Sequence, residues 1–180
     1  GWIWRVDRQS LRTVAERNIT DGVRYHPGGF QVTGETLWIP VAEYRANSTT
    51  RILELDRMTL VQRRSFLVED HIGALATDGH SVLLGANWDA RRFYRWTLGG
   101  QQLAVVANRH SLAVQDMKWS GGTVFAGGTG VGRSKGQCQL HQLDPSTFEL
   151  VRASGFKAGT CYTREGMAIW GGRFFFLPED

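Results

Sequence analysis

The sequence predicts an all-β fold, a β-propeller of four blades with four antiparallel strands each. Three observations support this prediction. The chain repeats with a period of about 45 residues, which is in the range of propeller blades. Each repeat contains strand-like runs of alternating apolar and polar residues, and glycine-containing turns separate these runs. The repeat is clearest at its start, where YHPGGF at residues 25–30 returns as DHIGAL at residues 70–75.

Each repeat opens with an inner hairpin, in which a glycine-containing turn joins two apolar runs of period two. These turns are expected on the face of the propeller opposite to the longer loops. The four predicted hairpins span residues 30–40, 75–85, 117–127 and 167–177.

A third strand follows in three of the repeats, at residues 51–56, 93–97 and 139–144. The fourth repeat has none, but residues 2–7 match residues 52–56 in pattern. We therefore expect the N-terminal strands to complete the blade that the C-terminal strands begin, because closing the ring leaves few exposed strand edges. The predicted blades within one domain, residues 1–180, are approximately 25–69, 70–113, 114–160, and 161–180 plus 1–24. A fragment of a larger propeller, or copies that associate to finish one, are the alternatives.

Length and charge narrow the class of protein. The 180 residues suffice for one domain with a substantial core. No apolar run approaches the ~20 residues of a membrane span, and the first residues resemble a strand rather than a signal peptide. We therefore expect a soluble protein. The net charge is +4, but the basic residues are spread along the chain and do not form the stripe that nucleic-acid binding requires. The expected partner is a small polar molecule or a protein, and oligomerisation stays open.

The two cysteines leave the compartment open. Cys138 and Cys161 could pair in an oxidising compartment or remain as two buried thiols. Asn18 and Asn47 each begin a match to the glycosylation pattern, which is too short to establish secretion. A secreted or periplasmic location is therefore one alternative.

Two sets of loops should meet around the central channel. In a propeller, the loop before each innermost strand lies on the same face as the loop between the second and third strands. These loops are longer than the turns of the other face and carry His, Trp, Arg and carboxylate side chains that no turn geometry requires, which favours a functional face here. The first set of loops carries His26, His71, Gln115, Asp116, Arg164 and Glu165, and the second comprises residues 43–45, 87–91, 127–136 and 178–180.

A metal site is one interpretation of this face. His26 and His71 occupy equivalent positions in adjacent blades, so both should point into the channel mouth, near Asp116 and Glu165. Imidazole and carboxylate ligands can hold one divalent metal ion, which can activate water. The alternatives for the two histidines are hydrogen bonds to a neighbouring blade, direct ligand contact, or acid–base chemistry.

Ligand binding is the other interpretation. Asn87 and Trp88 together can stack on and hydrogen-bond to a polar ligand, although Trp88 could equally cover the edge of the core. Glu165 stands where the first two repeats have glycine, which suggests either a ligand contact or a salt bridge to Arg164 or Arg91. The glycine-rich residues 127–136 lack the order of a phosphate-binding loop and precede no helix, so a hairpin loop is the better interpretation.

The chain resembles uncharacterised bacterial propeller proteins. The resemblance rests on residues 26–29, 70–73 and 87–88 and on the C-terminal residues 164–166 and 177–180. It spans the whole chain, and it implies the fold without implying an activity. The recurring Trp-Asp signature of WD40 proteins and the kelch pattern are both lacking, and nothing clearly matches the calcium-binding lactonase propellers.

The leading functional hypothesis is a ligand- or partner-binding module that uses the channel-mouth face. The alternatives are a metal-dependent hydrolase or lactonase-like enzyme, with His26, His71, Asp116 and Glu165 as metal ligands or base, and a structural assembly domain. Catalytic residues cannot be assigned from the sequence. The candidate ligand-binding residues are His26, His71, Asn87, Trp88, Arg91, Asp116, Arg164 and Glu165.

Overall fold

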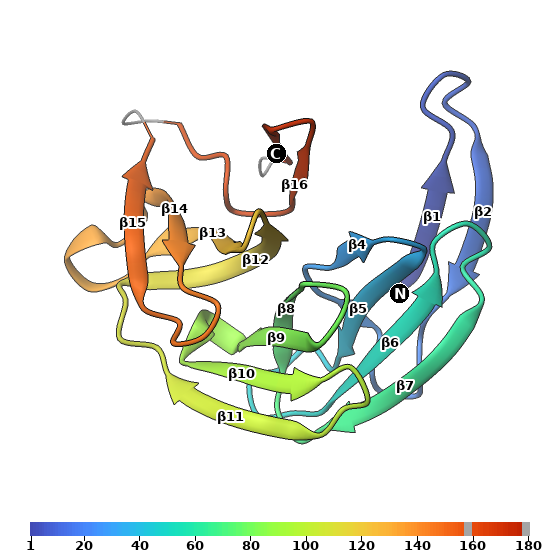
Figure 1. Cartoon of the computed structure of the whole chain (residues 1–180), viewed down its shortest axis with the longest axis horizontal. Coiled ribbons are helices and arrows are strands. Elements are labelled where there is room, and N and C mark those ends of the chain that lie inside the picture. Colours follow the sequence, from blue (N-terminus) through green and yellow to red (C-terminus); the bar gives the residue numbers. More distant parts are fainter. Residues whose placement is uncertain (157–159, 178–180) are drawn as a thin grey trace.

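The computed structural model describes residues 1–156 and 160–177 and is built almost entirely of β-strands. Three antiparallel sheets of the same design stand side by side around a common centre, as Figure 1 shows. Within each sheet, the strands are arranged in chain order from the inner to the outer edge. The all-β prediction is confirmed.

The three sheets form blades one to three. Blade one contains β3 (His26–Pro27), β4 (Gln31–Thr33), β5 (Thr36–Ala42), β6 (Thr50–Asp56) and β7 (Gln62–Val68). Its innermost strand is interrupted, because β3 and β4 both pair with β5. Blade two contains β8 (Ile72–Thr77), β9 (Val82–Asn87), β10 (Arg92–Thr97) and β11 (Gln102–Ala107). Blade three contains β12 (Leu112–Ser120), β13 (Thr123–Gly130), β14 (Cys138–Leu143) and β15 (Leu150–Gly155).

Two further pairs of strands flank these blades. The N-terminal half-blade is β1 (Trp2–Val6) with β2 (Thr13–Asn18), and the C-terminal half-blade is β16 (Met167–Trp170) with β17 (Arg173–Phe176). Each is a separate two-stranded sheet, although the guanidinium of Arg8 lies 5.1 Å from the ring centre of Trp170. The predicted closing blade, in which these strands share one sheet, is therefore not confirmed.

The turn between the third and fourth strands is covered in blade one but exposed in the N-terminal half-blade. In blade one, the Asp56 carboxylate accepts hydrogen bonds from the N–H groups of Met58 and Thr59, both at 2.9 Å, and Leu60 follows with a φ of 59°. Leu60 is buried and packs on the N-terminal half-blade. The equivalent residue of that half-blade, Leu11, has the same backbone conformation but is 77% exposed. In a closed ring a neighbouring blade would cover Leu11 as the N-terminal half-blade covers Leu60, and in the part of the chain that the structure describes Leu11 has no such cover.

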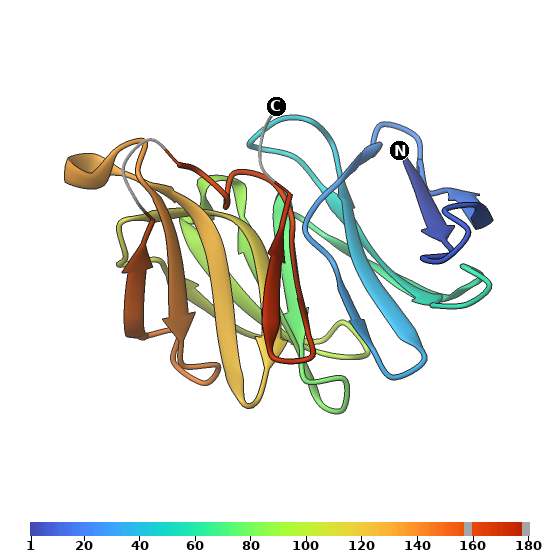
Figure 2. The same ribbon diagram turned by 90° about the horizontal axis from the view of Figure 1, so that it is seen from above.

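The inner hairpins have the predicted glycine turns. Ser120 pairs with Thr123, so only Gly121 and Gly122 form the loop, and their φ values are 57° and 77°. Positive φ at both loop residues is the type I′ geometry, which suits the twist of paired strands and favours glycine. Figure 2 shows these turns along one edge of the molecule, with the loops that lead into the blades at the opposite edge.

The core lies between the blades. One cluster joins blades two and three through residues such as Phe93 and Phe148, and a second joins blades one and two through Trp38 and Trp96. A third joins the N-terminal half-blade to blade one through Ile3 and its neighbours. The sheets therefore support one another face to face, as layers of a propeller do.

The side chain of Gln31 joins the inner strands of all three blades. Its Nε2 donates to the Trp119 carbonyl at 2.9 Å, and its Oε1 accepts from the N–H groups of Trp119 and Thr77 at 2.8 and 3.2 Å. Gln31 is 8% exposed. These bonds fix the spacing of β4, β8 and β12 below the channel mouth.

Cys138 and Cys161 form a disulfide, with their Cα atoms 5.2 Å apart. The bond ties the start of β14 to the segment that leads into the C-terminal half-blade. None of the helices in residues 1–156 and 160–177 is long and apolar enough to cross a bilayer.

Removing the disulfide should destabilise the protein. The loop that it closes spans 23 positions, and the loss of its cross-link is expected to lower the free energy of unfolding by about 3 kcal/mol. Urea denaturation of the Cys138→Ser, Cys161→Ser double variant against the oxidised parent measures this. If the two proteins were equally stable, the disulfide would not stabilise the fold by restraining the unfolded chain.

Candidate functional site

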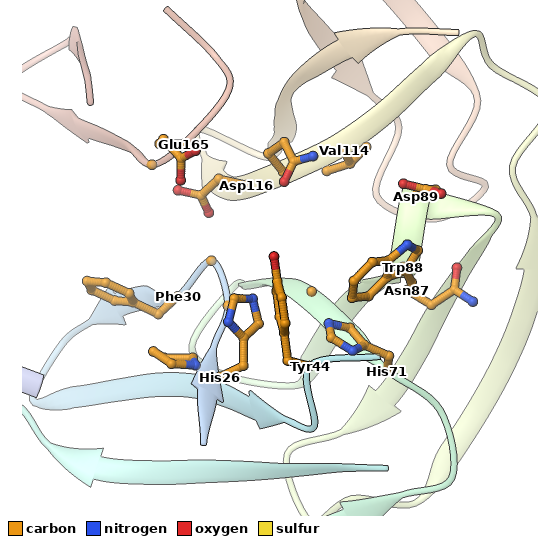
Figure 3. A pocket seen from close by; sticks show the side chains of 16 residues that line it. His26, Phe30, Tyr44, His71, Asn87, Trp88, Asp89, Val114, Asp116 and Glu165 are labelled. Atoms are coloured by element: carbon orange, nitrogen blue, oxygen red, sulfur yellow. The ribbon is translucent and has the colours of Figure 1, made fainter. Parts of the chain in front are cut away.

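A cavity of about 440 Å³ opens at the predicted functional face, where loops from the three blades meet the segment before β16 (Figure 3). We call it the mouth cavity. Its lining residues are His26, Pro27, Gly28, Gly29, Phe30, Tyr44, His71, Gly73, Asn87, Trp88, Asp89, Val114, Gln115, Asp116, Glu165 and Gly166.

Most of the candidate residues line this cavity. They are His26, His71, Asn87, Trp88, Asp116 and Glu165, whereas Arg91 and Arg164 are not among its lining residues. The candidate list omitted Tyr44, Asp89 and Phe30. Tyr44 and Asp89 lie in loops that the propeller pattern places on this face, so the signal for them was present. Residues 178–180, which the same pattern assigns to these loops, lie outside the described residues.

Four rings stand in mutual contact on one side of the cavity. The ring centres of His26 and Tyr44 are 4.7 Å apart, those of Tyr44 and Trp88 are 5.9 Å apart, and those of His71 and Trp88 are 4.7 Å apart. The centres of His26 and His71 are 6.0 Å apart, which completes the circuit. We call these four residues the aromatic group. In Figure 3 it faces Asp116 and Glu165 across the cavity.

His71 is fixed in one orientation from outside the cavity. Its Nδ1 lies 3.0 Å from the backbone oxygen of Arg45. A carbonyl oxygen only accepts, so Nδ1 carries the proton and Nε2 keeps a free lone pair. Burial lowers the pKa of His71, although the Arg45 carbonyl opposes the shift. Burial and the neighbouring His71 also lower the pKa of His26. Both rings are therefore neutral near pH 7.

Protein stability should fall as the pH decreases toward about 5. The pKa values of His26, His71 and His141 are all lowered from 6.5 by burial. Between their folded and unfolded values the unfolded chain binds more protons, so their contribution is complete above pH 6.5 and is lost as the pH falls. Urea unfolding at several pH values measures the slope. His71→Asn should flatten it, while the exposed control His80→Asn should not. A stability that rises on acidification over this range would contradict the assignment.

The loop that presents Trp88 has an uncommon backbone. Trp88–Ala90 forms a short 3-10 turn in which Asp89 and Ala90 have φ values of 55° and 46°. Left-handed conformations of non-glycine residues cost about 1–3 kcal/mol each and are concentrated at functional sites. The Trp88 N–H donates to the His71 carbonyl at 3.0 Å, which joins this turn to the loop before β8.

Asn87 supports this turn and does not offer its amide to the cavity. Its Nδ2 donates to the Asp70 carboxylate at 2.9 Å, and its Oδ1 accepts from the Arg92 N–H at 2.8 Å. Asn87 is also buried. We therefore interpret Asn87 as a residue that positions the Trp88 turn, and not as a hydrogen-bonding platform for a ligand.

Asp116 is already engaged by the protein. Its Oδ1 accepts from the Met117 N–H at 2.7 Å and from Lys118, and its Oδ2 accepts from the Met167 N–H at 2.8 Å. Burial raises the pKa of Asp116, an effect that Lys118 and these N–H groups oppose. A side chain at Gly29 could not be accommodated, because a Cβ there would lie 2.3 Å from the carboxylate. Asp116 thus joins blade three to the C-terminal half-blade.

The predicted metal ligands do not converge. Among residues 1–156 and 160–177, no group of three or more His, Cys, Asp or Glu side chains is arranged to hold a metal ion. The oxygens of Asp116 already accept hydrogen bonds from Met117, Met167 and Lys118. This donor set does not fit a resident metal.

The remaining charges in the cavity are negative. Asp89 and Glu165 are exposed, and neither forms a hydrogen bond or salt bridge through its side chain within the part of the chain that the structure describes. The predicted bridge from Glu165 to Arg164 or Arg91 is not found there. Among the described residues that line the cavity there is no Lys or Arg, although the chain as a whole carries +4.

Residues 1–122 match the model of the Family of unknown function (DUF6454). The chain belongs to this family. The matched part of this DUF6454 chain covers the N-terminal half-blade, blades one and two, and β12. No curated protein matches it.

Solved structures similar to this DUF6454 chain establish the β-propeller fold. The glutaminyl cyclase of Myxococcus xanthus is 15% identical with a TM-score of 0.61, over 84% of this chain and 60% of that one. Hydrazine synthase of Kuenenia stuttgartiensis is 15% identical with a TM-score of 0.54, over 84% of this chain and 42% of that one. The chain therefore spans 60% or less of the length of these structures, and at such identities the likeness concerns the fold alone.

Proposed function

We propose that this protein is a binding module whose mouth cavity takes a small polar molecule. The observation that carries the proposal is the aromatic group, four rings in mutual contact that share the cavity with the unpartnered carboxylates of Asp89 and Glu165. Ligand pockets combine aromatic walls with a few polar groups that orient the ligand.

Preorganisation supports the same proposal. Two members of the aromatic group are held by hydrogen bonds outside the cavity. His71 is bonded to the Arg45 carbonyl, and the turn that carries Trp88 is bonded through the side chain of Asn87. The left-handed turn at Asp89 and Ala90 places Trp88 and Asp89 on the cavity wall, and Ala90 anchors it in the core between blades two and three. Rings that are ordered before binding lose little entropy when a ligand arrives.

Ligand-observed NMR with a panel of sugars, amino acids, carboxylic acids and amines tests the proposal. Some members of the panel should bind the parent protein and lose most of their affinity to Tyr44→Ala. Tyr44 is 63% exposed, so its truncation should leave the fold intact. Tyr25→Ala is the control, because Tyr25 is 52% exposed and does not line the cavity. A panel without a Tyr44-dependent binder would contradict the proposal.

An assembly role is the second candidate function, favoured by the two half-blades. We propose that β1 and β17 pair with strands from another chain or another segment, which would also complete the ring. Both are outer strands of two-stranded sheets, and they carry exposed apolar side chains, among them Trp4 at 54% and Phe175 at 49%. Sedimentation over a wide concentration range tests association between copies. A mass that grows with concentration supports it, and a constant monomer mass contradicts it.

We also propose that the protein works in an oxidising compartment outside the cytoplasm. The Cys138–Cys161 disulfide supports this, because such bonds persist mainly in secreted and periplasmic proteins. Thiol alkylation of the protein in intact cells should leave both cysteines unmodified. Full alkylation of the native protein would contradict the location.

A further inference from the structure

We propose that the ligand of the mouth cavity is an organic cation, of the quaternary ammonium or protonated amine class. The inference rests on the proposed binding function and narrows it to one chemistry. It depends on three features of the cavity: its aromatic surface, the sign of its charges, and the absence of Lys and Arg from the lining residues that the structure describes.

The rings form an aromatic surface in the cavity that can attract a positive group. The faces of Trp, Tyr and Phe rings carry negative charge density, and a cation within about 6 Å of a ring centre is attracted to it. The centres of Tyr44 and Trp88 are 5.9 Å apart and their planes are tilted by 60°, so the two rings touch, and a cation would lie over the pair at the cavity surface rather than between the rings. In Figure 3, Tyr44 projects from the aromatic group toward the side with Asp116 and Glu165.

The charges of the lining have the complementary sign. Asp89 and Glu165 are the acidic groups that remain uncompensated, because Lys118 pairs with Asp116. Neutral His26 and His71 add no positive charge near pH 7. Two free carboxylates in a cavity with an aromatic wall attract a cation and repel an anion.

Other ligand chemistries fit less well. A phosphate or carboxylate ligand would meet Asp89 and Glu165, and the described lining residues offer no Lys or Arg to bind it. A metal ion lacks a convergent donor set within the described residues. A neutral sugar could stack on Trp88, but it would gain nothing from the charge of the carboxylates, and this difference can be measured.

Calorimetry with choline and its uncharged isostere, in which a tert-butyl group replaces the trimethylammonium group, tests the inference. The two molecules have the same shape, so their ratio of affinities isolates the charge. Choline should bind at least about tenfold more tightly than the isostere, and added salt should reduce the difference.

Three variants locate the effect. Asp89→Asn with Glu165→Gln should weaken choline about tenfold while leaving the isostere unchanged. Asn tolerates the left-handed backbone at position 89, so the turn is kept. Tyr44→Phe should retain choline, whereas Tyr44→Leu should lose it. Glu149→Gln, which removes an exposed carboxylate outside the cavity, is the charge control and should change nothing.

The outcomes separate this inference from the function on which it rests. Equal affinity for choline and the isostere, with both dependent on Tyr44, overturns the cation and keeps the binding cavity. Choline binding that survives Asp89→Asn with Glu165→Gln also overturns it. If neither molecule nor any member of the polar panel binds in a Tyr44-dependent way, both proposals fail.

Discussion

Lys118→Met should lower the free energy of unfolding by about 3–5 kcal/mol. The side chains of Lys118 and Asp116 are 10% and 5% exposed and form a buried ion pair. Without the ammonium group, Asp116 would be a buried charge held by backbone N–H groups alone. Replacing one partner of such a pair costs more than the pair contributes, because the other charge is left uncompensated.

The pH dependence of this variant gives a second readout. Burial raises the pKa of Asp116, and the ammonium group of Lys118 opposes this effect. In Lys118→Met the pKa of Asp116 should therefore rise further above its unfolded value. The folded state then gains protons as the pH falls, so the deficit of the variant should shrink on acidification. Lys135→Met, at an exposed position, is the control and should change stability little. A loss no greater than that of the control would contradict the structural role of the pair.

Gln31→Leu should destabilise the protein by about 3 kcal/mol, since it leaves three buried or part-buried backbone groups without partners at about 1 kcal/mol or more each. These are the N–H and carbonyl of Trp119 and the N–H of Thr77. Urea denaturation measures the loss. The matched control is Gln102→Leu on the exposed edge strand β11. If both substitutions have the same small effect, Gln31 does not join the three blades as described.

The repeat allowed most of the fold to be predicted. Period-two patterns and glycine turns predict strands and hairpins, because both depend on local sequence. The strand with which an edge strand pairs does not depend on local sequence alone. Residues 2–6 and 173–176 have strand patterns that are equally compatible with one shared blade or with two incomplete ones, and in the structure they lie in separate sheets.

The site could be predicted in part, for the same reason. His26 and His71 occupy equivalent places in adjacent repeats, so their proximity follows from the fold. Asp116 and Lys118 are two residues apart in one strand, which puts them on the same face. That spacing was a sign of an internal ion pair rather than a free ligand. The circuit formed by Tyr44 and Trp88 with the histidines depends on loop conformation, including the left-handed turn at Asp89, which no local pattern specifies.

The most direct test of the account is an amide NMR titration of the whole chain with choline. We predict that the shifted signals will come from residues around the mouth cavity, namely 26–30, 44, 71–73, 87–89, 114–116 and 165–166. Saturable shifts confined to this set would support a cation-binding cavity at the channel mouth. Shifts confined to the inner hairpin turns of the opposite face, or none at saturating choline, would contradict it.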